Sequence, residues 1–186
     1  MKKTIVTATL YTAITAVLLG LIYPAVITGI SMLLFRDRAT GQLITRNGDV
    51  IGSRIIGQPF TGATYFHSRP SAAGTGYDAQ SSSGSNLAPS SKTLVDRVNT
   101  SVKSEAEGST DVPVDLVTAS ASGLDPDITP AAALYQVPRI ARERHLSADA
   151  VTQLVQANTT PRQLGLLGEP RVNVLQLNLA LDQLHP

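Results

Sequence analysis

The run TIVTATLYTAITAVLLGLIYPAVITGISMLLF, residues Thr4–Phe35, decides the architecture of this chain because it contains no charged residue. A membrane-spanning helix needs roughly 20 apolar residues. A secretory signal peptide has an apolar core of only about 7–15 residues and ends at a small-residue cleavage site, which Met32–Phe35 does not provide. A core helix is rarely this long without a charge. We therefore predict an uncleaved membrane anchor over residues 1–36, spanning about 5–35.

The anchor is longer than one span requires. Fully helical, the run would reach roughly 48 Å, against a hydrocarbon core of about 30 Å. Pro24 is expected to kink it, because proline removes a helical hydrogen bond. Small residues let a second helix approach closely, so we predict a helix-packing site at Ala13, Ala16, Gly20 and Pro24.

Charges flanking the span bear on its orientation. Lys2 and Lys3 precede it, Arg36 and Arg38 follow it, and by lysine and arginine alone the two sides tie. The free amino group and Asp37 favour a cytoplasmic N-terminus. We therefore expect a single-pass protein of the cell (inner) membrane, with residues 37–186 forming an extracytoplasmic (periplasmic) domain.

The composition excludes several classes of function. There are 15 Lys+Arg against 14 Asp+Glu, and no basic stripe follows Asp37, so no nucleic-acid partner is expected. The chain has no cysteine, which excludes disulfides and thiol chemistry. Its histidines are isolated in sequence, so no metal site is expected. No phosphate-binding loop, nucleophile elbow or zinc-protease motif is present, so no catalytic residue is assigned.

The first half of the predicted domain begins with a hairpin. Asn47-Gly48 between two apolar runs predicts strands at Leu43–Arg46 and Val50–Ile56. A four-residue apolar spacing from Leu94 to Ala106 predicts a helix, capped by Ser90 or Ser91 and ended by Gly108. Val112–Thr118, interrupted by Pro113, is expected to be an edge strand.

The second half contains two helix starts. Thr129-Pro130 and Ser147 are predicted N-caps, the second of a helix running to about Ala157. Pro138 is expected to break or kink the first helix and to leave Val137 extended. The tail RVNVLQLNLALDQL fits both a helical stripe and strand alternation, and we favour a helix. The fold class is thus α/β (α+β): one N-terminal transmembrane helix, then one mixed domain with a small sheet and several helices.

A long loop, YFHSRPSAAGTGYDAQSSSGSNLAP at Tyr65–Pro89, joins these elements. Loops of this length without regular structure are uncommon in compact domains unless they are functional, and aromatic and arginine side chains anchor interfaces. The alternative for Tyr65 and Phe66 is that they cover the domain's own core. The predicted partner-contact residues are Tyr65, Phe66, His67, Arg69, Tyr77, Asp78 and Asn86.

Several ordered blocks of the chain resemble the C subunit family of the Kdp potassium-transporting ATPase. They are YPAVITGI from Tyr23, IGQPF from Ile56, YFHSRPSAAG from Tyr65, YDAQSSSGSNLAPSS from Tyr77, DLVTASASGLDPDITPAAALYQVPRIA from Asp115 and LGEPRVNVLQLNLALD from Leu167. Ala88 and Ala121 stand where the family commonly has glycine, and Arg36 where proline is common.

The resemblance implies an accessory, non-catalytic subunit of a high-affinity, ATP-driven potassium uptake complex. Its implied partners are a channel-like potassium-binding subunit, a P-type ATPase subunit and a small membrane subunit, with the lipid bilayer around them. ATP and potassium act at the level of the complex, and no cofactor is expected on this chain itself. The family is also described as raising the affinity of the ATPase subunit for ATP, an effect that a domain outside the cytoplasm could exert only through the membrane part.

Two alternatives belong to other classes. A membrane-anchored serine hydrolase would use Ser83 or Ser85, although the sequence pairs neither with a base. A nucleotide-binding helper would require the reversed topology.

Overall fold

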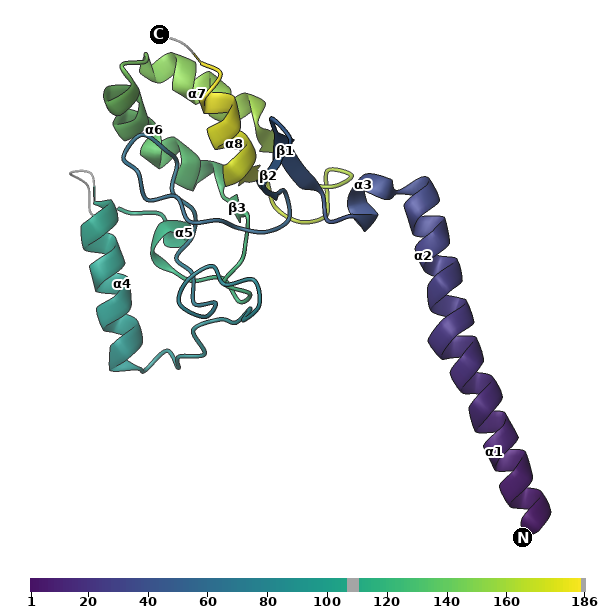
Figure 1. The fold of residues 1–186 in the computed structure, drawn as a ribbon. Helices are drawn as coiled ribbons and strands as arrows, with labels where there is room; N and C mark the ends of the chain where they lie inside the picture. Colours follow the sequence, from purple (N-terminus) through teal and green to yellow (C-terminus); the bar gives the residue numbers. More distant parts are fainter. Residues whose placement is uncertain (107–110, 185–186) are drawn as a thin grey trace. The chain divides into compact units, whose positions relative to one another are not determined.

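The computed structural model describes residues 1–106 and 111–184 (Figure 1). The chain divides into two compact units, Met1–Leu43 and Ile44–Pro186. The first unit is helical, and the second combines helices with a two-stranded and a three-stranded sheet. The expected class, an apolar N-terminal helix followed by a mixed α/β domain, is confirmed.

The first unit contains one long apolar helical segment. α1 (Lys2–Val17) passes into a π-helical turn, η1 (Leu18–Ile22), and then into α2 (Tyr23–Leu34), which the short α3 (Arg36–Ala39) follows. By length and composition, Lys2–Leu34 is able to cross a membrane. Pro24 lies in the first turn of α2, directly after the π turn. Proline donates no backbone hydrogen bond. The switch between π-helical and α-helical hydrogen bonding therefore falls where the α-helical pattern is weakest. The kink itself stays a prediction.

The predicted hairpin is present as β1 (Leu43–Arg46) and β2 (Asp49–Ser53). Asn47 and Gly48 have φ angles of 54° and 92°, as a two-residue hairpin turn requires. The second strand ends at Ser53, three residues before the expected Ile56. The cause is local: the Ser53 hydroxyl accepts a hydrogen bond from Ile55 N at 3.3 Å, which turns the chain out of the strand.

The helix predicted near Leu94 is α4 (Lys92–Glu105), with Ser91 at its N-cap position. Leu94, Val98 and Val102 lie half-buried on one face, as their spacing indicated. The expected end at Gly108 lies outside the described residues.

The expected strand at Val112–Thr118 is wrong. The segment contains a short helix, α5 (Val114–Val117), with Pro113 at the N-cap position. The adjacent residues Leu116 and Val117 are both buried, which a helical turn allows and strand alternation does not. The Asp115 carboxylate also accepts a hydrogen bond from Thr129 N at 2.7 Å, which ties this turn to the start of the next helix.

α6 (Pro130–Arg144) begins as predicted, because the Thr129 hydroxyl accepts from Ala132 N at 3.2 Å. Pro138 does not break the helix, which continues through it, and the expected extended conformation of Val137 is wrong because this residue is helical and buried. The alternative of a kink at Pro138 stays a prediction. Val137, Ile140 and Ala141 all pack into the core, and their burial outweighs the lost hydrogen bond. The carbonyl that loses its donor belongs to Leu134, which is 41% exposed and therefore lies toward solvent.

The rest of the chain forms two helices and a small sheet. Ser147 caps α7 (Ala148–Ala157) through Ala150 N, as predicted. β3 (Asp127–Ile128) and β4 (Thr159–Thr160) pair antiparallel with the central β5 (Arg171–Asn173), with Ile128 opposite Val172. The helix favoured for the tail is present as α8 (Val174–Leu181), capped by Asn173. The first three residues of the tail form β5 instead.

The core gathers where α6, α7 and α8 meet the three-stranded sheet. Phe66 from the long loop is completely buried within it, beside residues such as Ile140, Val151, Val172, Leu177 and Leu181. Figure 1 shows α4 apart from the α6–α8 group, with loop segments running between them. The long loop is therefore built into the interior on one side and faces α4 on the other.

Candidate interaction site

Side-chain amides hold the start of the long loop. Asn178 of α8 accepts from Phe66 N through Oδ1 at 2.9 Å and donates to Phe66 O through Nδ2 at 3.0 Å. Gln136 of α6 does the same for His67, accepting from its N–H at 2.7 Å and donating to its carbonyl at 3.3 Å. A side-chain amide has both an acceptor oxygen and donor N–H groups. Each of these two amides therefore bonds the N–H and the carbonyl of one loop residue, as the backbone of a neighbouring β-strand would.

Two arginines of α6 hold the preceding carbonyls. Arg139, 8% exposed, donates to the carbonyls of Ala63 and Tyr65. Arg144 donates to Thr64 O at 2.8 Å, and its guanidinium carbon lies 4.6 Å from the centroid of the Tyr65 ring. We call Ala63–His67 the clamped segment, since side chains of α6 and α8 bind the backbone of all five of its residues.

Further along, Ser71 organises the next turn of the loop. Its hydroxyl donates to Gly123 O at 2.6 Å and accepts from Ala73 N and Tyr77 N at 3.1 and 2.8 Å. Gly123 has φ +67°, and a Cβ there would lie 2.6 Å from both Ala73 N and Ser83 O. Only glycine therefore permits this close approach of three backbone segments.

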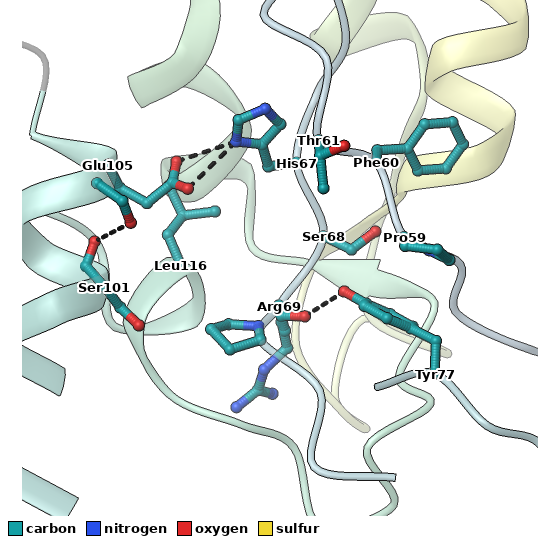
Figure 2. Close-up of a pocket in the computed structure, with 12 residues that line it drawn as sticks. Pro59, Phe60, Thr61, His67, Ser68, Arg69, Tyr77, Ser101, Glu105 and Leu116 are labelled. Carbon is teal, nitrogen blue, oxygen red and sulfur yellow. Dashed lines mark hydrogen bonds and ion pairs between the residues drawn. The ribbon is translucent and has the colours of Figure 1, made fainter. Parts of the chain in front are cut away.

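A pocket of about 440 Å³ opens between the loop and α4 (Figure 2). Residues 59–61, 67–70 and Tyr77 line the loop side, and Ser101, Ser104 and Glu105 line the helix side, with Leu116 of α5 adding an apolar wall. The histidine ring points at the Glu105 carboxylate, with Nδ1 3.2 Å from both of its oxygens. Three contacts fix α4 beside the loop. They are the contact between His67 and Glu105, the bond from Arg97 to Ser71 O at 2.8 Å and the bond from Tyr135 to Glu105 O at 3.1 Å.

Arg69 lies at the edge of this pocket. Its Nη1 is 3.1 Å from Asp125 Oδ2, and its backbone carbonyl accepts from the Tyr77 hydroxyl. Within the described residues, its buried Nε has no hydrogen-bond partner. Arg69 thus keeps hydrogen-bonding capacity that the domain itself does not use.

Two acidic groups near the loop have raised pKa values. Burial raises the pKa of the Tyr77 phenol above its ordinary 10.0, although a hydrogen bond with Ser68 opposes the shift. Burial also raises the pKa of Asp127, and the bond from Asn173 and the charge of Arg171 oppose it. In each case the shift is toward the neutral form, because burial has removed solvent from the charged form.

The predicted partner-contact residues fall into three groups. Phe66 lies in the core, so the alternative of core packing holds for its side chain. Half-buried Tyr65 packs against Phe60 with the rings tilted by 43° and their centroids 5.9 Å apart. Three residues line the pocket, and they are His67, Arg69 and Tyr77. Asp78 accepts from Gln80 N within the loop, and Asn86 is exposed with φ 52°.

The predicted helix-packing residues lie on the long apolar helix. Ala13 and Ala16 belong to α1, Gly20 to the π turn and Pro24 to α2. All four are exposed, and a Cβ at Gly20 would meet nothing within 4 Å. Their packing against another helix stays a prediction.

The structure also bears on two other chemistries. The Ser83 hydroxyl donates to Ala72 O at 3.0 Å, so its proton helps to hold the loop. Among the residues that the structure describes, no group of three His, Asp or Glu could hold a metal ion.

Sequence reasoning missed the residues that hold the loop: Gln136, Arg139 and Asn178. One signal was available. Asn178 interrupts the apolar run VLQLNLAL, and a polar residue on a buried helix face needs a specific partner.

Comparisons with known proteins agree along nearly the whole chain. The family model described as KdpC, K⁺-transporting ATPase, c chain, matches residues 5–183. A potassium-transporting ATPase KdpC subunit from Acidobacterium capsulatum is 64% identical over 179 residues, covering 96% of this chain and 97% of the relative. The subunits of the same name from Koribacter versatilis and Gemmatimonas aurantiaca are 58% and 56% identical, covering 100% and 95% of this chain and 97% and 91% of those relatives. The chain therefore belongs to the KdpC family, the C chains of potassium-transporting ATPases.

Proposed function

We propose that this chain is an accessory, non-catalytic subunit of a high-affinity, ATP-driven potassium uptake complex, which it assembles and stabilises. The family match over residues 5–183 carries the proposal. Its proposed partners are a channel-like potassium-binding subunit, a P-type ATPase subunit and a small membrane subunit. ATP and potassium bind elsewhere in the complex, and any effect on ATP affinity passes through the membrane helix.

The loop pocket is the proposed contact with a partner subunit. The clamped segment gives it a rigid backbone, so binding there loses little conformational entropy. The pocket is lined both by polar groups, His67, Glu105, Arg69 and Tyr77, and by apolar groups such as Phe60 and Leu116. Protein interfaces combine apolar and polar groups in this way. Because the Phe66 side chain is buried, its proposed role is to fix the segment rather than to touch the partner.

Blocking the pocket from the helix side tests this contact without disturbing the clamped segment. Ser104→Trp places a large side chain at the pocket wall, on an exposed residue of α4. Asn99→Trp on an exposed position of the same helix outside the pocket lining is the matched control. We expect recovery of the partner subunits with the tagged Ser104→Trp chain to fall at least about tenfold, the factor that corresponds to 1.4 kcal/mol of binding. Equal recovery with both variants would remove the pocket from the interface and leave the subunit role intact.

The proposed topology has its own test. A cysteine at the exposed Ser82 would be the chain's single thiol. We expect a membrane-impermeant maleimide to label it in intact cells whose outer membrane has been permeabilised. Labelling only after lysis would place residues 37–186 in the cytoplasm and favour the nucleotide-binding helper instead.

A further inference from the structure

A leucine-rich turn projects from the three-stranded sheet. It lies between β4 and β5, and its leucines Leu164, Leu166 and Leu167 are 90%, 81% and 60% exposed. We call residues Gln163–Gly168 the leucine tip, a stretch without a charge. Single exposed leucines are ordinary, but three within four residues at one turn form a patch that marks an interaction site.

The turn is held in one conformation by its own backbone. Gln163 and Leu167 exchange two hydrogen bonds of 2.9 Å, and Leu166 N donates to Gln163 O at 3.1 Å. Leu164 has φ 54°, a left-handed conformation that is unfavourable for a leucine. An ion pair of Arg162 with Glu169 closes the base of the turn. The strained backbone and the closed base keep the leucines outward, so their exposure is a built feature of the domain.

Chain connections limit how far the leucine tip can lie from the end of the apolar helix. The tip leads directly into β5, whose last residue, Asn173, donates to Arg54 O at 2.8 Å. Arg54 follows the end of β2, and in a hairpin the first residue of β1, Leu43, lies beside that end. Residues 35–42 alone separate Leu43 from Leu34, the last residue of α2. This tether reaches at most about 32 Å when fully extended.

We propose that the leucine tip inserts into the lipid headgroup and acyl-chain boundary next to the chain's own transmembrane helix. The inference rests on the proposal that Lys2–Leu34 crosses the membrane. Its partner class is lipid rather than protein, because the tip is a narrow convex turn that a fluid bilayer accommodates without a matching groove. At its base, the side chains of Arg162 and Arg171 are 44% and 41% exposed and form ion pairs with Glu169 and Asp127. This polar base suits the headgroup level beneath an apolar tip.

Single-cysteine fluorescence tests the insertion on the full chain. The chain has no native cysteine, so Leu166→Cys can carry an environment-sensitive nitrobenzoxadiazole probe in nanodiscs of phosphatidylethanolamine and phosphatidylglycerol. A second preparation contains lipids with a nitroxide near the top of the acyl chain, to quench probes at the tip, and lipids with a nitroxide near its end, to quench a probe at the middle of the span. Leu167→Cys provides a second reporting position on the tip. Ser82→Cys in the exposed loop and Leu19→Cys in the apolar helix are the matched controls.

We expect the probes at 166 and 167 to show blue-shifted emission and to lose intensity with the nitroxide lipid, while the probe at 82 does neither. Quenching at 19 but not at 166 or 167 would overturn the insertion and leave the transmembrane helix in place. A blue shift at 166 that requires the partner subunits and is insensitive to the nitroxide would also overturn it, in favour of docking on protein. An unquenched probe at 19 would overturn both the helix and the tip.

Discussion

Replacing Asn178 with leucine tests whether a side-chain amide holds the long loop. The two side chains have the same number and branching of heavy atoms, so no cavity is created, but Phe66 loses the partners of its N–H and its carbonyl. Both groups are buried, because Phe66 and Asn178 are 0% and 2% exposed. Each unsatisfied buried group costs roughly 1–3 kcal/mol, so we expect a destabilisation of about 2–5 kcal/mol after the leucine's own apolar gain. That is a large fraction of the roughly 5–15 kcal/mol of a typical domain.

The measurement is urea unfolding of the full chain in nanodiscs, followed by circular dichroism. Hydrogen exchange of the Phe66 amide, read by mass spectrometry, reports on the segment directly. Asn99→Leu on the exposed face of α4 is the control, and a surface change of this kind is expected to stay within about 0.5 kcal/mol. Equal stability and equal exchange in the two variants would refute the role of the amide.

Asn178→Asp sharpens the same test through pH. A protonated carboxylic acid has one acceptor and one O–H donor, so it can reproduce both bonds to Phe66, whereas the buried carboxylate cannot. Burial should raise the folded-state pKa of the new carboxyl above its unfolded value. Its stabilising contribution is then fully present below the unfolded pKa and is lost as the pH rises through the folded pKa. A variant whose deficit relative to the native chain stays constant with pH would contradict this account.

Two further predictions concern the loop. Gly123→Ala should destabilise the domain by about 2–5 kcal/mol, since its Cβ would lie 2.6 Å from two backbone atoms. Gly165→Ala, at a similar φ of +74° with nothing within 4 Å, should cost only the backbone strain of about 1–2 kcal/mol. Similar unfolding midpoints for the two variants would refute the close approach. Tyr77→Phe should remove a pH dependence of the folding stability at alkaline pH. The pKa of the Tyr77 phenol is raised in the folded chain above its ordinary value of 10.0. The stability that the neutral phenol contributes is therefore fully present below the unfolded-state pKa and is lost as the pH rises through the folded-state pKa. The stability gap between the native chain and Tyr77→Phe, from urea midpoints between about pH 8 and 11, should therefore narrow with rising pH, and a constant gap would argue against the shift.

Local signals in the sequence predicted the parts of the fold that depend on neighbouring residues. The hydroxyls of Thr129 and Ser147 cap the helices that follow them, and Asn47-Gly48 makes the hairpin turn. The failures at Val112–Thr118 and Pro138 have a common cause. In both places burial against distant elements decided the conformation, and the proline that suggested a break was accommodated.

The candidate site was predictable only in outline. The length of the loop and its aromatic residues identified a segment that lines the pocket, and its contact with a partner stays a prediction. What holds it was hidden, because Phe66 and Asn178 are separated by 112 positions and His67 and Gln136 by 69. Polar side chains that pair with a distant backbone leave no periodic pattern, so neither spacing nor composition shows them.

The same sequence separation has a consequence for biosynthesis. Protein chains emerge from the ribosome N-terminus first, so the clamped segment leaves it long before Asn178 is made. Until α8 has been added, the N–H and carbonyl of Phe66 lack their native partners, and the phenylalanine lacks the core formed with Leu177 and Leu181. The clamped segment therefore becomes fully ordered only after α8 has been made, and a nascent chain interrupted before residue 178 lacks the two hydrogen bonds that fix Phe66.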